Sequence, residues 1–136
     1  MSYAGFRSVI LLVLLVGSVL LLAGCGGDGK ISYGYYDLSD SVIVNYIDGE
    51  GNKGYVSLKL TVELPEGNVV TIGTMSQRIR HATVLYLKNL SSDELTNYIA
   101  NDQEALADGI KDAMSEETKA DNLAIERILF RDFVMQ

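Results

Sequence analysis

The chain has 136 residues, of which 18 are acidic and 11 are basic, so its formal charge at pH 7 is −7. This negative charge repels nucleic-acid phosphates, and we expect no nucleic-acid partner. A single cysteine, Cys25, and a single histidine, His81, exclude an internal disulfide and a His/Cys metal cluster.

An apolar segment near the N-terminus allows two interpretations. Residues 9–24 carry no charge, and Arg7 is the only charged residue before them. Residues 22–25 (LAGC) look like the lipobox of bacterial lipoproteins, in which the cysteine is acylated, so Cys25 is a candidate lipidation site. Alternatively, residues 9–24 form a retained membrane helix about 24 Å long, shorter than the ~30 Å hydrocarbon core. Both interpretations place the rest of the chain outside the cytoplasm, because Arg7 is the only nearby cation.

A short tether and a β-hairpin are expected next. Residues 26–34 (GGDGKISYG) are rich in glycine and lack apolar periodicity, which is typical of a tether. The β-branched and aromatic residues within 38–47 predict a strand. Residues 55–64 (YVSLKLTVEL) alternate between apolar and polar side chains, which predicts a strand with one buried face. The three glycines within 48–54 predict the turn that joins the two strands into a hairpin.

A long helix is predicted after the hairpin. Residues 69–73 are ambiguous, because their valines, threonine and isoleucine favour strands by propensity. Thr74 and Gln77 have the spacing of a capping box, and an apolar stripe in three- and four-residue steps extends the helix to about residue 88.

Two further caps predict two shorter helices. Ser91 and Glu94 have the spacing of a second capping box, which opens a helix through residue 99. Asn101 is the expected N-cap of the third helix, with Glu104 at its third helical position. The polar residues 115–122 then predict an exposed loop.

The last segment, residues 124–136 (AIERILFRDFVMQ), carries apolar residues at both odd and even positions. A strand that is apolar on both faces is typical of the centre of a sheet, so we expect a central strand here. The predicted order is β-β-α-α-α-β, and the fold class is α+β. The helices are expected to cover one face of an antiparallel or mixed sheet, because a hairpin alone cannot bury its apolar side.

No combination of side chains in the sequence indicates catalysis. His81 has no cysteine partner, and the carboxylates are spread over expected loops and helix surfaces. We therefore expect neither an enzyme nor a bound cofactor or metal. Arg78 and Arg80 lie on the polar side of the long helix, where a solvated surface is the default interpretation. They are the candidate contacts for an acidic partner protein.

Taken in order, these segments resemble the FliL family of flagellar basal-body-associated membrane proteins, in an alphaproteobacterial-like form. The resemblance extends over residues 35–136, and the order and spacing of its segments carry it rather than any single motif. The segments are YYDL (35–38) with VIVN (42–45), YVSLKLTVEL (55–64), RIR (78–80), LYLKNLSSDEL (85–95) and ILFRDFVMQ (128–136).

The resemblance implies a small periplasmic α+β domain similar to the stomatin-type (SPFH) fold. In this arrangement residues 1–25 are the anchor or lipoprotein signal, residues 26–34 the tether and residues 35–136 the domain. It also implies a non-enzymatic protein of the inner (cytoplasmic) membrane at the flagellar basal body. Such a protein associates with stator and other basal-body proteins and supports motor torque and swimming motility. Because the anchor holds a small domain in a plane, we also expect lateral self-association into a ring or arc.

Two departures from the family pattern leave an alternative open. The tether is shorter than is usual in the family. The lipobox-like residues 22–25 are also unusual, since members generally keep an uncleaved helix. The alternative is a periplasmic lipoprotein that acts as a binding module without a flagellar role.

Overall fold

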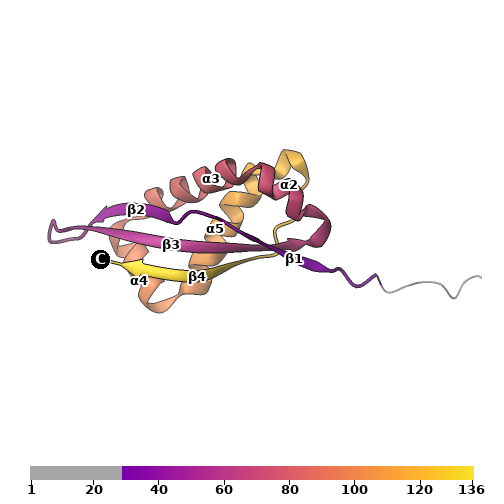
Figure 1. Ribbon diagram of the computed structural model, residues 1–136. Coiled ribbons are helices and arrows are strands. Elements are labelled where there is room, and N and C mark those ends of the chain that lie inside the picture. Colours follow the sequence, from indigo (N-terminus) through magenta and orange to yellow (C-terminus); the bar gives the residue numbers. More distant parts are fainter. Residues whose placement is uncertain (1–28) are drawn as a thin grey trace, which may run out of the picture. The chain divides into compact units, whose positions relative to one another are not determined.

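The structure is a computed structural model that describes residues 29–136. The apolar segment 9–24 and Cys25 lie outside the described residues, so the predicted anchor and lipidation site stay predictions. Among the helices from residue 29 onward, none has the length and apolar character needed to cross a membrane. Residues 31–136 form one unit. Its elements (Figure 1) are β1 (Tyr33–Asp37), β2 (Val42–Ile47), β3 (Lys53–Pro65), the 3₁₀ helix η2 (Glu66–Asn68), α2 (Val69–Thr74), α3 (Ser76–Asn89), α4 (Ser92–Asn101), α5 (Gln103–Glu117), the 3₁₀ helix η3 (Lys119–Asp121) and β4 (Arg127–Met135).

The antiparallel sheet is built around β3, its longest strand. Residues 56–58 of β3 pair with both β2 and β4, and residues 61–63 pair with both β1 and β4. β1 and β2 therefore lie end to end along one edge of β3, while β4 lies along the other edge. The alternation predicted for β3 is confirmed by its buried side chains, which are Val56, Leu58, Leu60, Val62 and Leu64.

The predicted hairpin between β2 and β3 is also confirmed, and Asp48 organises its turn. The Asp48 Oδ1 atom accepts hydrogen bonds from the backbone N–H groups of Glu50 and Asn52, at 2.9 and 2.8 Å. Hydrogen bonds to its carboxylate, first the one from the Asn52 side chain, lower the pKa of Asp48. Gly51 completes the turn with a φ of 89°, a left-handed conformation that glycine adopts without a steric penalty.

The segment before the hairpin turn contains two strands, β1 and β2, where one was predicted. β1 begins at Tyr33, inside the range expected for the tether, and β2 begins at Val42. Between them Leu38 enters the core, and its N–H donates to the carbonyl of Leu60 at 3.0 Å. The serine and aspartate that follow Leu38 favour turns and let the chain change direction. The strand predicted over 38–47 is therefore correct only from Val42, and the order is β-β-β-α-α-α-α-β.

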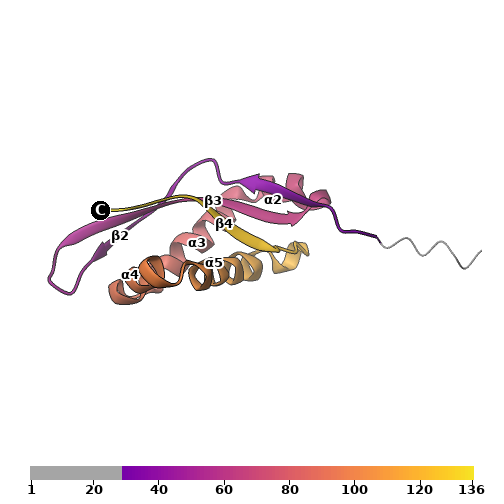
Figure 2. The ribbon, with the colours of Figure 1, turned by 90° about the horizontal axis from the view of Figure 1, so that it is seen from below.

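The helices cover one face of the sheet, as predicted (Figure 2). α3 packs against β2, while α5 packs against both α3 and β4. α3 and α5 approach each other closely at Gly109, because Tyr86 of α3 lies over the position that a Cβ atom would occupy there. The fully buried apolar side chains of the helices belong to the same core cluster as the buried side chains of the strands, and they are Ile72, Ile79, Leu87, Leu106, Ile110 and Met114.

The ambiguous residues 69–73 belong to α2. Thr74 is the last residue of this helix, so it is not the N-cap that was predicted. The N-cap of α3 is Met75, which makes no side-chain capping bond. The Thr74 hydroxyl donates instead to the carbonyl of Thr71 at 2.7 Å, because the chain is already helical there. The predicted capping box of Thr74 and Gln77 is therefore wrong. Complete burial of Ile72 accompanies the helical conformation, against the local propensity for a strand.

The second predicted cap is confirmed and the third is wrong by one residue. Ser91 Oγ accepts from the N–H of Glu94 at 3.2 Å, and the Glu94 carboxylate accepts from the N–H of Ser91 at 2.9 Å. The backbone hydrogen bond from Ser91 is the main cause of a lowered pKa at Glu94. α4 extends to Asn101, so the cap of α5 is Asp102, which accepts from the N–H of Ala105 at 3.0 Å.

The loop predicted over residues 115–122 is largely helical. α5 continues to Glu117, and η3 follows after a single residue. That residue, Thr118, is fully buried, and its hydroxyl donates to the carbonyl of Met114 at 2.9 Å. The polar composition of the segment reflects the exposed side of a helix end rather than an irregular loop.

β4 is an edge strand, so the predicted central position is wrong, and β3 occupies the centre. Lys59 lies opposite Asp132, whereas the next residue, Leu60, lies opposite Phe130. Arg131 is therefore an extra residue in β4, and such a β-bulge reverses the alternation of the strand. The apolar side chains before and after the bulge face the helices together, and these are Ile128, Phe130, Phe133 and Met135.

Candidate interaction surfaces

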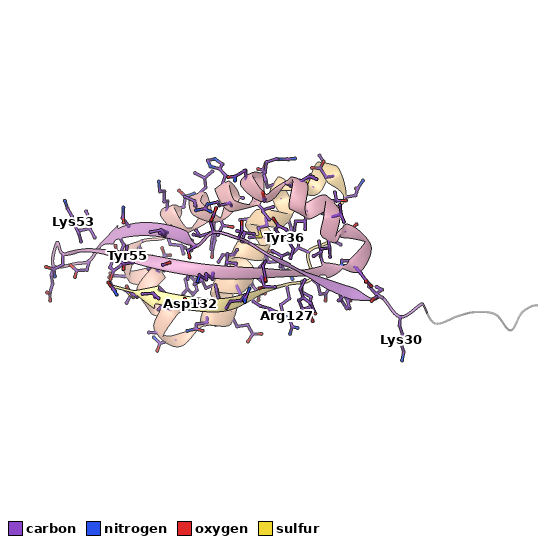
Figure 3. The ribbon with its side chains drawn as sticks, viewed as in Figure 1. Lys30, Tyr36, Lys53, Tyr55, Arg127 and Asp132 are labelled. Atoms are coloured by element: carbon purple, nitrogen blue, oxygen red, sulfur yellow. The ribbon has the colours of Figure 1, made fainter. Side chains whose placement is uncertain are left out.

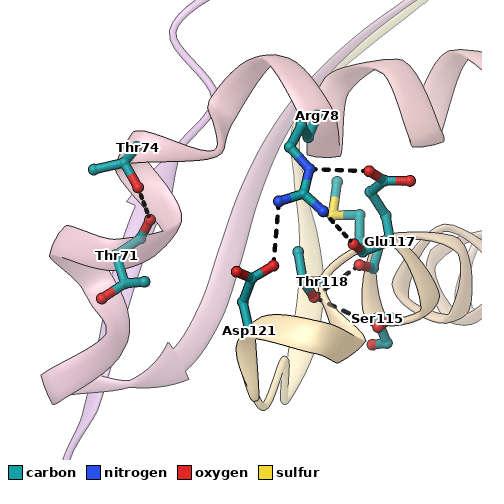
Figure 4. A network of polar contacts seen from close by, with 8 residues as sticks. Thr71, Thr74, Arg78, Ser115, Glu117, Thr118 and Asp121 are labelled. Carbon is teal, nitrogen blue, oxygen red and sulfur yellow. Dashed lines mark hydrogen bonds and ion pairs between the residues drawn. The ribbon is translucent and has the colours of Figure 1, made fainter.

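Arg78, one of the two predicted partner contacts, joins the start of α3 to the end of α5 (Figure 4). Its Nε atom lies 3.0 Å from Oε1 of Glu117, and its Nη1 atom lies 3.2 Å from Oδ2 of Asp121. Its Nη2 atom donates to the Glu117 carbonyl at 2.8 Å. The hydrogen bond to Glu117, followed by that to Asp121, raises the pKa of Arg78 above its ordinary value. The side chain thus connects three helical elements of its own domain.

Arg80, the second predicted contact, ties α3 to the connection between β1 and β2. Its Nη1 atom lies 3.2 Å from Oδ2 of Asp40, and its Nη2 atom donates to the carbonyl of Ser41 at 2.9 Å. Arg78 and Arg80 therefore both have intramolecular partners. Their contact with an acidic partner protein stays a prediction. His81, the next residue of α3, is exposed.

The face of the sheet that points away from the helices is called the open face here. Figure 2 shows α3, α4 and α5 on the opposite side of the strands. Figure 3 shows Tyr55, Asp132 and Arg127 spread along the sheet. The strand register assigns to the open face the residues Tyr33, Tyr35, Asp37, Ile43, Asn45, Ile47, Lys53, Tyr55, Ser57, Lys59, Thr61, Glu63, Arg127, Leu129, Asp132 and Val134, together with Arg131 at the bulge.

The first polar cluster of the open face is centred on Glu63, which is only 7% exposed. The Arg127 Nε atom donates to Oε2 of Glu63 at 2.8 Å, and the Tyr35 hydroxyl donates to Oε1 at 3.2 Å. Both carboxylate oxygens therefore have a donor, one from β1 and one from β4. A carboxylate that is satisfied in this way can be covered without leaving an unpaired charge.

The second polar cluster is centred on Asp37 and joins the same three strands. The Thr61 hydroxyl donates to Oδ1 of Asp37 at 2.5 Å, and the Arg131 guanidinium pairs with Oδ2 at 2.5 Å. The bulge places Arg131 where it reaches Asp37 across β3. The two clusters together cross the sheet from β1 to β4 and stabilise the pairing of its strands.

The open face also carries exposed apolar side chains. Eight large apolar side chains are exposed in the described part of the chain, and five of them lie on this face. These five are Tyr33, Tyr35, Ile43, Ile47 and Tyr55. Sequence reasoning missed this surface, although one signal was available. β2 (VIVNYI) has isoleucine at two of its three positions on this face, Ile43 and Ile47, where a solvated face would carry polar residues.

A hollow of about 650 Å³ lies where β2, β3 and the end of β4 meet, and its lining includes Tyr46, Gly54, Tyr55 and Gln136. The Tyr55 hydroxyl donates to Oε1 of Gln136 at 2.9 Å. Within residues 29–136, no three His, Cys, Asp or Glu side chains are grouped so that they could hold a metal ion.

Comparison with known proteins gives the family. The family model described as FliL, flagellar basal body-associated protein, matches residues 35–136. The match begins within β1 and includes the hairpin, the whole helix layer and β4. No curated protein matches the chain. The match extends over most of the chain and confirms the resemblance seen in the sequence, so the chain belongs to the FliL family of flagellar basal body-associated proteins.

Proposed function

We propose that the protein is a non-enzymatic, membrane-anchored component of the flagellar basal body that associates with the stator and supports motor torque and swimming motility. The match of the FliL family model to residues 35–136 is the observation that carries this proposal. An open face with two paired charge clusters and exposed apolar side chains is consistent with a protein that acts through contacts with other proteins.

Deletion of the gene in the flagellated host tests the proposal. The expected result is that filaments remain, while swimming in soft agar and in viscous medium and the torque of tethered cells decrease. Plasmid-borne wild-type protein should restore all three. Normal swimming and torque in the deletion strain would contradict the proposal.

A matched pair of variants links the phenotype to the folded domain. Leu87→Asp places a carboxylate in the core, where Leu87 is 1% exposed, so this variant should not restore motility. Lys88→Asp introduces the same side chain at the adjacent, exposed position of α3 and should restore it. Restoration by both variants would mean that the folded domain is dispensable for motility.

We further infer that residues 9–24 hold the protein in the inner membrane, with a stomatin-like (SPFH-like) domain in the periplasm. The support is the uncharged segment itself and the position of Arg7 before it. Mass spectrometry of the mature N-terminus distinguishes the two kinds of anchor. An acylated Cys25 at the N-terminus identifies a lipoprotein, and an intact leader that includes Arg7 identifies a retained helix.

The second candidate is a periplasmic lipoprotein that binds a partner without a flagellar role. The lipobox-like residues 22–25 favour it. An acylated Cys25 together with unchanged motility of the deletion strain would select this candidate. Flagellar genes beside this one would favour the first.

A further inference from the structure

We propose that the folded domain makes a contact of its own with the lipid bilayer, through apolar side chains at one end of the sheet. This end consists of residues 31–36 and 65–74 and is called the tether end here, because the tether leads into it. The inference rests on the anchor proposed above, in residues 9–24 or at Cys25, and names the part of the domain that meets the same bilayer. The apolar side chains would lie at the boundary between the headgroups and the acyl chains.

Contacts between β1 and the segment that follows β3 form the tether end. The N–H of Glu66 donates to the carbonyl of Ser32 at 2.9 Å, and the Ser32 hydroxyl donates to Oε2 of Glu66 at 2.7 Å. Val69 packs so closely over Gly34 that a Cβ atom there would lie 2.5 Å from its Cγ2 atom. Figures 1 and 2 show α2 beside β1, at the end of the sheet opposite the hairpin between β2 and β3. The start of β1 and the start of α2 therefore belong to one end of the domain.

Exposed large apolar side chains lie at the tether end. Val70 is 81% exposed and Ile31 is 62% exposed, which are the two highest values for such side chains in the described part of the chain. Tyr33, two residues after Ile31, is 40% exposed. Tyrosine is enriched where a membrane meets water, because its ring is apolar and its hydroxyl is polar. Grouped apolar side chains of this kind mark a surface that another protein or a membrane covers.

The distribution of charge selects a bilayer as the occupant and this end as the place of contact. Glu66 is the only charged residue within 31–36 and 65–74, and it accepts the hydrogen bond from Ser32. Residues 92–117, which contain α4 and α5, carry eight acidic residues and one lysine, so anionic headgroups repel this surface. The open face carries seven ionised side chains, whose removal from water is unfavourable. Of these three surfaces, the tether end therefore approaches lipid at the lowest electrostatic cost.

The short tether makes even a weak contact effective. Seven Cα–Cα steps lead from residue 24, the last of the uncharged segment, to Ile31, so a fully extended tether spans at most about 25 Å. A contact over such a short linker is effectively intramolecular, with an effective concentration on the order of millimolar. The three apolar side chains therefore need little affinity of their own to hold the domain on the lipid.

Fluorescence quenching by lipid, measured on the full chain in vesicles of phosphatidylcholine and phosphatidylglycerol, tests the proposal. Cys25→Ser first removes the native thiol and leaves residues 9–24 in place as the anchor. Val70→Cys then receives an environment-sensitive dye, and Leu85→Cys, 47% exposed on α3, receives the same dye as the matched control. Phosphatidylcholine with a nitroxide high on its acyl chain should quench the dye of V70C several-fold more than that of L85C. Use of one dye at both positions cancels the affinity of the dye itself for lipid.

A matched pair of isoleucine variants tests the chemistry of the contact. Ile31→Glu places a carboxylate at the tether end, whereas Ile47→Glu places one at a position of similar exposure, 57%, near the hairpin turn. Both side chains are exposed, so both variants should keep the wild-type melting temperature. Ile31→Glu should lower the quenching of V70C to the level of L85C, because a carboxylate resists transfer out of water. Ile47→Glu should leave the quenching unchanged.

Three results would overturn the lipid contact. One is equal quenching of V70C and L85C in the same vesicles. Another is quenching of V70C that Ile31→Glu does not lower. The third is a blue-shifted emission from V70C that nitroxide lipid does not quench and that fades as lipid is added in excess, because this would indicate a second copy of the chain at the tether end.

Flotation of the vesicles separates the contact from the anchor on which it rests. A chain that floats with the vesicles but shows equal quenching at both positions would refute only the contact. A chain that stays behind in the gradient would refute the anchor and, with it, the contact. Neither measurement depends on swimming, so failure of the flagellar role in a deletion strain would leave both conclusions standing.

Discussion

Replacement of Gly109 by alanine is a sharp test of the contact between α3 and α5. A Cβ atom at this position would lie 1.9 Å from Oη and 2.3 Å from Cζ of Tyr86, so the tyrosine ring would have to move. Overpacking of this kind costs about 1–3 kcal/mol, and the overlap of more than an ångström places it in the upper part of that range. Alanine is better than glycine in a helix interior by roughly 1 kcal/mol. The expected net loss of unfolding free energy is about 1–2 kcal/mol.

Removal of the tyrosine ring should turn the destabilisation caused by Gly109→Ala into a stabilisation. In a Tyr86→Ala background nothing obstructs the new methyl group, so only the gain in helix propensity remains. Gly109→Ala should then stabilise the domain by roughly 1 kcal/mol. The two values differ by about 2–3 kcal/mol, which is the coupling energy that a double-mutant cycle measures for residues in direct contact.

Urea unfolding of the full chain in a mild detergent, followed by circular dichroism, provides the four free energies. Gly67→Ala is the matched control, because a Cβ atom there would meet no other heavy atom within 4 Å. The control should change the unfolding free energy by less than about 0.5 kcal/mol. If Gly109→Ala stabilises the domain in both backgrounds, the close contact with Tyr86 is absent in solution, and the packing argument fails.

The caps and charges of the helix layer give further tests. Ser91→Ala should lower the free energy of unfolding in urea by about 1 kcal/mol, because it removes an N-cap. Thr74→Ala should lower it by less than about 0.5 kcal/mol. Equal losses in the two variants would contradict the assigned caps. The folded-state pKa of Glu94 lies below the ordinary value of 4.5, so its contribution to stability is present above that value and is lost as the pH falls through the folded pKa. Glu94→Gln should therefore lose less melting temperature than the wild type on acidification from about pH 6 to pH 3, and an equal loss would exclude this carboxylate as a source of acid sensitivity. Arg78→Met should lower the melting temperature more than Lys88→Met, since Arg78 bonds two elements and Lys88 has no ion pair within residues 29–136; the reverse order would contradict the structural role of Arg78.

Local patterns predicted the hairpin and the capping box at Ser91, because both depend on residues that are close in sequence. The alternation of β3 requires only that one face is buried, and the cap requires only neighbours three residues apart. The cap at Thr74 failed for the opposite reason. Whether Thr74 begins a helix depends on the preceding residues, and those are helical because Ile72 is buried by the tertiary fold.

The position of β4 and the partners of the arginines could not be predicted locally. The bulge at Arg131 brings Ile128 and Phe130 onto the same face as Phe133 and Met135, and it is visible only against the register of β3. Leu129 and Val134 are apolar residues on the other face of the strand. The sequence indicated correctly that Arg78 lies on the polar side of its helix. Its partners, Glu117 and Asp121, come from a segment far along the chain, so they depend on how α3 and α5 pack.

The arrangement of strands around β3 also has a consequence for the order of folding. β2 and β3 are joined by a short turn, whereas Leu60 of β3 and its partner Phe130 of β4 are about 70 residues apart, so closing that loop costs ~2 kcal/mol more in chain entropy. The hairpin should therefore form early, and β4 should pair last, after the intervening helices have docked. Until then one edge of β3 stays unpaired beside exposed apolar side chains, which is the kind of intermediate that aggregates. A chain interrupted before Arg127 would keep this edge of β3 unpaired. The pairing of β4 is therefore the folding step that removes the aggregation-prone edge.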